Sequence, residues 1–170
     1  MRSTDKDMIQ LEPFDEALLE YCSSSPDYRR YKECILRGCR AGDVLAKYAR
    51  ATWYIYGDAD LGVVADSGMA FKLLAKISGF PRAQLDMAIL CESGTGTKKD
   101  VRKAFRLYEA SAKSGVVAAM GELARCLFWG IGAARDPSRA LALRRRVYRL
   151  RKTHQPVRQG KPVSQKGRQQ

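Results

Sequence analysis

The stretch GTGTKKDVRKAFRLYEASAKSG, residues 94–115, predicts the fold, because its pattern returns as GIGAARDPSRALALRRRVYRLR, residues 130–151. Each copy begins with Gly-x-Gly, has an Asp six residues after the first Gly, and has an Ala four residues after that Asp. The copies stand 36 residues apart. Self-similarity at a spacing of about 20 to 50 residues is typical of repeat proteins. Weaker copies of the Asp-to-Ala step begin at Asp66 and, with Tyr31 in the Ala position, at Asp27.

Each copy is predicted to form two helices. Asp100 stands where an N-cap would accept the free backbone N–H groups of the first helical turn, and apolar residues follow it at helical spacing. Gly115 can take the left-handed conformation that ends a helix, after which helical periodicity resumes until Gly130. Over the whole chain we expect helices at residues 13–22, 27–40, 43–56, 66–78, 80–92, 100–114, 116–129 and 136–151.

Small residues recur where two helices must approach closely. Ala51, Ala88 and Ala124 occupy equivalent positions in successive copies, and a larger side chain there would hold the helix axes apart. Because one helix pair cannot bury its own apolar face, several pairs must stack in an all-α solenoid. We expect three parts: an N-terminal extension over residues 1–12, a helical repeat domain over residues 13–152, and a basic flexible tail over residues 153–170.

This pattern resembles the Sel-one-like repeat, a relative of the tetratricopeptide repeat, over residues 27–151. The resemblance is most specific within residues 80–130, where the family positions are held by Ala83, Met87, Ala88, Gly94, Gly96, Asp100, Ala104, Tyr108, Ala112 and Gly115. Departures are Arg50 in place of a Leu, a three-residue insertion near Gly57, and Arg144 in place of an aromatic residue. The resemblance implies a right-handed α/α solenoid of about four helix pairs, whose first helices line a concave surface that binds segments of other proteins.

The resemblance also implies a set of groove-facing residues. Carried over position by position, the partner-binding set is Tyr48, Thr52, Ile55, Arg82, Leu85, Ile89, Glu92, Arg125 and Phe128. Its apolar members would form a floor, and its two arginines would hold an acidic group on the partner. The alternative is that these apolar side chains pack against the neighbouring helix, and hydrophobic periodicity does not separate the two interpretations.

The positive charge is concentrated at the C-terminal end. Residues 135–170 hold 12 Lys and Arg and a single acid, whereas residues 1–134 hold 19 bases and 17 acids. Binding of a polyanion, either nucleic acid or an anionic membrane surface, therefore concerns the last helix and the tail alone. Its candidate contacts are Arg144, Arg145, Arg149, Arg151 and Lys152. The alternative is a solvated face on a capping helix, followed by a soluble tail.

Residues with catalytic or metal-binding chemistry are scarce. The single histidine, His154, lies at the start of the predicted tail, so a Ser-His or Cys-His relay would lack a fixed base. Cys22, Cys34 and Cys39 could approach one another, but buried thiols are favoured over a zinc site without a fourth ligand. Carboxylates such as Glu109 have no evident mate in the sequence. We therefore expect no catalytic residue, no cofactor and no metal.

The predicted function is a non-enzymatic protein–protein interaction module of bacterial type. It would be an adaptor, a scaffold or a dedicated single-partner binder, such as a toxin-neutralising or chaperone protein, that recognises an acidic or apolar segment. We expect a monomer or weak oligomer. An odd number of cysteines, five in all, and the lack of a signal-peptide pattern or an apolar run of 18 residues indicate a cytoplasmic protein, with export by a specialised bacterial system left open.

Overall fold

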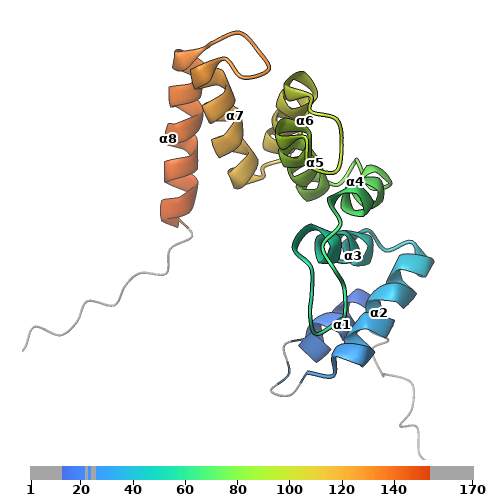
Figure 1. Ribbon diagram of the computed structural model, residues 1–170. Helices are drawn as coiled ribbons and strands as arrows, with labels where there is room; N and C mark the ends of the chain where they lie inside the picture. Colours follow the sequence, from blue (N-terminus) through green and yellow to red (C-terminus); the bar gives the residue numbers. More distant parts are fainter. Residues whose placement is uncertain (1–12, 22, 24–25, 154–170) are drawn as a thin grey trace, which may run out of the picture.

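The computed structural model describes residues 13–21, 23 and 26–153, and within these residues it contains helices and no strand. The helices are α1 (Pro13–Tyr21), α2 (Tyr28–Ala41), α3 (Val44–Tyr56), α4 (Ser67–Ala75), α5 (Pro81–Ser93), α6 (Val101–Lys113), α7 (Val117–Trp129) and α8 (Pro137–Thr153). They follow one another along a curved path from α1 to α8 (Figure 1). The predicted all-α fold is confirmed. Cys22, His154 and most of the predicted tail lie outside the described residues.

Aspartates begin the helices at the repeated Asp position. Asp27, Asp66, Asp100 and Asp136 each accept a hydrogen bond from a backbone N–H two or three residues further on, at 2.8–3.0 Å. These bonds satisfy donors that the first helical turn leaves without an intrahelical partner. Asp43 caps α3 in the same way, at 2.8 Å from the Leu45 nitrogen, although the sequence pattern did not single it out.

The second glycine of each Gly-x-Gly turn recurs because it touches the preceding helix pair. Gly132 has φ +73°, and a Cβ built on it would lie 2.1 Å from the carbonyl oxygen of Val101, the first residue of α6. Gly96 has φ +70°, and its Cβ would lie 2.2 Å from the carbonyl carbon of Ser67, the first residue of α4. Both glycines therefore let a turn lie directly on the start of the previous pair's second helix.

The helix α4 ends earlier than predicted, at Ala75 rather than residue 78. The Ile77 nitrogen bonds to the Leu74 oxygen at 3.0 Å, which is the tighter i→i+3 pattern. The tighter turn accompanies burial of the Ile77 side chain in the core. Gly79, which follows, has no positive φ, unlike its counterpart Gly115.

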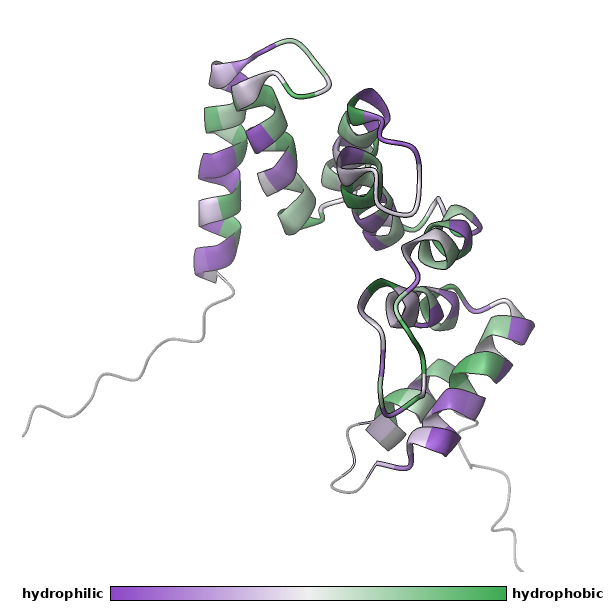
Figure 2. Cartoon of the chain, viewed as in Figure 1, coloured by the Kyte–Doolittle hydropathy of each residue, from purple (hydrophilic) through white to green (hydrophobic). Residues whose placement is uncertain are grey.

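The core runs along the stack as three clusters of buried side chains. One joins α1, α2 and α3, the next lies among α3, α4 and α5, and the largest joins α5, α6, α7 and α8. Ala51, Ala88 and Ala124 are buried as predicted. Figure 2 shows the result as alternating hydrophobic and hydrophilic bands along most helices, with hydrophilic bands prominent on α8. This arrangement leaves the outer faces of the helices free to line surface hollows.

Candidate interaction surfaces

The predicted groove residues are distributed among several parts of the molecule. Three of them line one hollow, two line another, and the remainder serve packing or lie on exposed helix faces. The hollow lined by three of these residues is called the inner hollow, and the hollow lined by two of them is called the end hollow. The two hollows differ in lining and charge.

The inner hollow has a volume of about 670 Å³ and lies where α3, the start of α5 and the start of α7 meet. It is lined by Tyr48, Phe80, Pro81, Arg82, Leu85, Ser114, Gly115, Val116, Val117 and Ala118. Tyr48, Arg82 and Leu85 belong to the predicted groove. The turn residues 114–116 were missed, because a turn between helices carries no groove signal in the repeat pattern.

One wall of the inner hollow is held in place by Tyr48. Its ring meets the ring of Phe80 edge to face, with centroids 5.1 Å apart, and its hydroxyl donates a hydrogen bond to Asp86 Oδ2 at 2.8 Å. Burial raises the pKa of Tyr48 and also that of the Asp86 carboxyl. Since the Tyr48 proton is already donated, this wall offers a partner apolar ring surface rather than a hydrogen-bond donor.

Arg82 supplies the charge of the inner hollow. Its side chain is exposed, and no ion pair within the described residues includes it. Leu85, one turn further along α5, is half-buried and packs against the core. The inner hollow thus combines apolar walls with one exposed cation that forms no ion pair within the described residues, although its charge acts on the neighbouring Asp86 carboxyl.

Glu92 and Arg125 of the predicted groove bind each other. The Arg125 guanidinium donates to both Glu92 oxygens, at 2.7 and 2.8 Å, and its Nε donates to Glu122 at 2.8 Å. The Tyr108 hydroxyl donates to Glu92 at 2.9 Å. Burial alone would raise the pKa of Glu92, but the hydrogen bonds from Arg125 and Tyr108 outweigh it and lower that pKa. The positive charge of Arg125, which was expected to bind a partner, is therefore neutralised by carboxylates of this protein. Together with the Tyr108 hydroxyl, the Glu92–Arg125 pair joins α5, α6 and α7.

The expectation that Glu109 lacks a mate is wrong. Its carboxylate accepts a hydrogen bond from Arg139 of α8 at 2.7 Å and lies 3.7 Å from the Lys113 ammonium. Lys113 stands only four residues along the same helix, whereas Arg139 was not evident because it stands 30 residues away, in the next repeat. Ion pairs thus connect the helix pair α5 and α6 with the helix pair α7 and α8 at Glu109 as well as at Glu92.

Besides Glu92, three predicted groove residues line neither of these two hollows. The Thr52 hydroxyl donates to the carbonyl of Ala49 in its own helix at 2.7 Å. Ile55 packs against the core cluster of α3, α4 and α5, as the packing alternative expected. Ile89 is 47% exposed on α5 and lies outside both linings.

The end hollow lies between α7 and α8 and has a volume of about 520 Å³. It is lined by Gly121, Glu122, Ala124, Arg125, Phe128, Trp129, Arg144, Val147, Tyr148 and Arg151. It brings two predicted groove residues, Arg125 and Phe128, together with two predicted polyanion contacts, Arg144 and Arg151. The sequence did not identify Trp129 and Tyr148, which are 67% and 69% exposed.

The candidate polyanion contacts are all exposed on α8. Within the described part of the chain, no ion pair includes Arg144, Arg145, Arg149, Arg151 or Lys152. By contrast, Arg139 near the start of the same helix is paired with Glu109. The positive surface of α8 is therefore confined to its second half.

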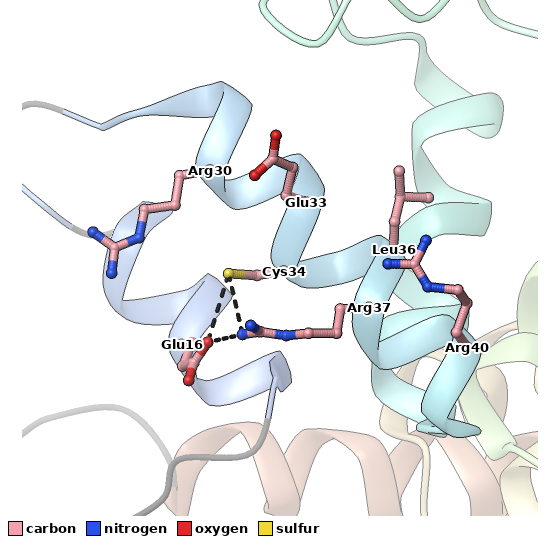
Figure 3. A pocket seen from close by; sticks show the side chains of 7 residues that line it. All are labelled: Glu16, Arg30, Glu33, Cys34, Leu36, Arg37 and Arg40. Atoms are coloured by element: carbon pink, nitrogen blue, oxygen red, sulfur yellow. Dashed lines mark hydrogen bonds and ion pairs between the residues drawn. The ribbon is translucent and has the colours of Figure 1, made fainter.

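A third hollow, of about 560 Å³, lies between α1 and α2 (Figure 3). In it the Glu16 carboxylate pairs with the Arg37 guanidinium, and the Cys34 sulfur lies 3.7 Å from Glu16. Burial raises the pKa of the Cys34 thiol, which keeps it protonated at neutral pH and makes it a poor nucleophile. We assign no role to this hollow.

Residues 13–21, 23 and 26–153 contain neither a membrane-spanning helix nor a cluster of metal ligands. None of the helices there is both long and apolar enough to cross a membrane. No group of three or more His, Cys, Asp or Glu side chains is arranged there to hold a metal ion.

Comparison with known proteins identifies the repeat. The sequence model of the Sel1 repeat matches residues 44–78, 81–116 and 117–143, which is more than half of the chain and leaves α1 and α2 unmatched. A protective antigen of uropathogenic Escherichia coli with an SLR fold has a similar structure, with a TM-score of 0.73 and 20% identity over 81% of this chain. A Sel1 repeat protein from Oxalobacter formigenes gives a TM-score of 0.72 at 20% identity, also over 81% of this chain. The matched regions are 30% and 55% of those two chains, and no curated protein sequence matches this one.

Proposed function

Because this chain belongs to the Sel1 repeat family, whose fold is generally a protein–protein interaction module, we propose that its inner hollow binds a segment of another protein. The bound segment carries an apolar side chain that packs on Phe80 and Leu85, and an acidic group that pairs with Arg82. The observation that carries the proposal is the meeting of three groove residues, from two first helices, around one hollow.

The chemistry of the inner hollow supports a partner of this kind. Burying one large apolar side chain contributes about 1.5–3 kcal/mol, and an exposed ion pair such as one to Arg82 contributes about 0.2–1 kcal/mol. Free-energy contributions of this size orient the bound segment but do not by themselves make the complex tight. A stable complex also needs about 800 Å² of buried surface on each partner. The bound segment therefore extends from the inner hollow along α5, where Ile89 is exposed.

We place this adaptor in the cytoplasm. The four cysteines among the described residues, Cys34, Cys39, Cys91 and Cys126, are free thiols. Thiols of this kind persist where the cell keeps cysteines reduced. The neutralising or chaperone role for a single partner is a narrower form of the same proposal, because both need one dedicated binding segment.

The test is site-specific photo-cross-linking in native lysate, with and without nuclease treatment. A photoreactive amino acid at Ala118, which lines the inner hollow and is exposed, should capture a discrete protein band. Adding Arg82→Glu should reduce that band at least fivefold, whereas the matched charge reversal Arg106→Glu, on the exposed face of α6, should leave it unchanged. Equal bands for both variants would overturn the proposal. Loss of capture on nuclease treatment would instead favour the polyanion function of α8.

A further inference from the structure

The end hollow is a repeat of an interior surface that already holds a helix. The helices α7 and α8 begin 36 residues after α5 and α6, so each residue of the last pair has a counterpart 36 positions earlier. Shifted by this amount, Ala124, Arg144 and Tyr148 of the end hollow become Ala88, Tyr108 and Ala112, which share a buried cluster with α7. The end hollow is therefore the position that the first helix of a following pair would take.

The equivalent interior surface, formed by α5 and α6, shows how a first helix packs on the preceding pair. Ala88 of α5 and Tyr108 and Ala112 of α6 share one buried cluster with Met120 and Leu123 of α7. In addition, Glu92 pairs with Arg125 across the same junction. The seat thus consists of an apolar floor with one polar contact at its edge.

At the C-terminal end this seat is uncovered within the described residues. Phe128, the counterpart of Glu92, is 40% exposed, and Tyr148, the counterpart of Ala112, is 69% exposed. Trp129 beside them is 67% exposed, and its ring meets the Phe128 ring edge to face at 4.9 Å. Clustered exposed aromatic side chains beside arginines are typical of protein-binding surfaces rather than of a solvated end cap.

Two positions at which the last pair differs from the preceding pair indicate the charge of a helix that would bind in the end hollow. Arg144 stands at the position of Tyr108, and Arg151 stands at the position of Gly115. The two arginines lie seven residues apart on α8, which is two turns or roughly 10 Å along the axis. Neither belongs to an ion pair within the described residues. A helix lying along α8 would meet them with carboxylates that are also two turns apart.

We propose that the end hollow binds an acidic amphipathic α-helix of a partner protein, which stacks on α7 and α8 as the first helix of another pair. The helix matches the 13 residues of α7, roughly 20 Å long, with an apolar stripe toward Phe128 and Tyr148 and acids at positions i and i+7. Residues 154–170 do not suit this seat, because they contain four basic residues and no acid. The inference concerns a surface separate from the inner hollow and stands independently of the function proposed there.

The chain contains a built-in reporter for this site. Trp129 lines the end hollow, whereas the only other tryptophan, Trp53, is buried in the α1, α2 and α3 cluster. The probe is a 14-residue helical peptide without tryptophan, with leucines at i, i+3, i+4 and i+7 spacing and glutamates two turns apart beside them. Titrated into the full-length chain, it should shift Trp129 emission to shorter wavelength in a saturable manner. A peptide of the same composition in scrambled order should not.

Two charge reversals on the same helix separate a shaped seat from general attraction. Arg144→Glu should weaken peptide binding at least tenfold, whereas Arg146→Glu, which is exposed and does not line the end hollow, should weaken it less than threefold. A peptide with lysines in place of the two glutamates should bind the Arg144→Glu variant better than the native chain. Arg82→Glu should change nothing, so failure here and failure of the inner hollow are distinguishable.

Three results with the peptide would overturn the proposal. One is an equal loss of binding in the Arg144→Glu and Arg146→Glu variants. Another is equal binding of the scrambled peptide, and the third is a Trp129 spectrum that does not respond to peptide in a chain shown by circular dichroism to be folded. If duplex DNA shifts Trp129 emission and displaces the peptide, the second half of α8 is a polyanion site and the helix seat is excluded.

Discussion

The carboxylate of Glu92 on α5 accepts hydrogen bonds from the guanidinium of Arg125 on α7, with N···O distances of 2.7 and 2.8 Å. Tyr108 of α6 donates a third bond to the same carboxylate. One acidic side chain therefore links three helices from two successive pairs. In a solenoid, where each pair contacts only its neighbours, such a link contributes directly to the interface energy between pairs.

Breaking this link should destabilise the protein by more than breaking an exposed ion pair. Glu92→Gln should lower the free energy of unfolding by about 1–2 kcal/mol, since it removes a charged acceptor that is 22% exposed and leaves Arg125 partly unpaired. Urea unfolding followed by circular dichroism measures the change. In the control Glu33→Gln, which removes an ion pair with side chains 90% and 69% exposed, no comparable loss is expected. Equal losses in the two variants would show that the Glu92 link has no special role.

The pH dependence of stability should reflect Glu109 and Glu92. A hydrogen bond from Arg139 is the main cause that lowers the pKa of Glu109 below its ordinary value of 4.5. A carboxyl whose pKa is lower in the folded than in the unfolded state stabilises the fold above the unfolded value and loses that contribution as pH falls. Unfolding free energy should therefore decline as pH falls below about 4.5. In Glu109→Gln the decline should be shallower, and an unchanged slope would contradict this assignment.

Gly132 should tolerate a side chain poorly, because two separate costs apply. Gly132→Ala places a Cβ 2.1 Å from a backbone oxygen. It also forces the alanine into the left-handed backbone conformation, which residues with a side chain rarely adopt. Gly115→Ala isolates the second cost, since Gly115 has φ +92° but nothing within 4 Å of the added Cβ. We expect Gly115→Ala to cost about 1 kcal/mol and Gly132→Ala to cost at least about 2 kcal/mol more, with a lower melting temperature. Equal melting temperatures would mean that the turn does not lie on α6 as described.

The features that could be predicted are those that each repeat specifies locally. An Asp before a helix caps that helix whatever its neighbours are, so Asp100 and its counterparts were identified from spacing alone. Burial of Ala88 was predicted for a similar reason, because a repeated small residue indicates close helix packing.

The features that could not be predicted depend on which helices face one another. A polar residue on a first helix has the same spacing whether it faces solvent or the next helix, so the pairing of Glu92 with Arg125 was not visible in the pattern. The exposure of Trp129 and Tyr148 was missed for a related reason. A terminal pair carries the same repeat as an interior pair, and only the structure shows that nothing described covers it.

Hydrogen–deuterium exchange of the full-length chain, with and without the protein captured at Ala118, tests the central claim most directly. If the inner hollow binds a protein segment, exchange should slow at the backbone amides of residues 80–85 and 114–118, while those of α8 exchange as before. Slowing confined to residues 137–153 would contradict the claim, because the partner would then be held by the basic last helix and not by the inner hollow.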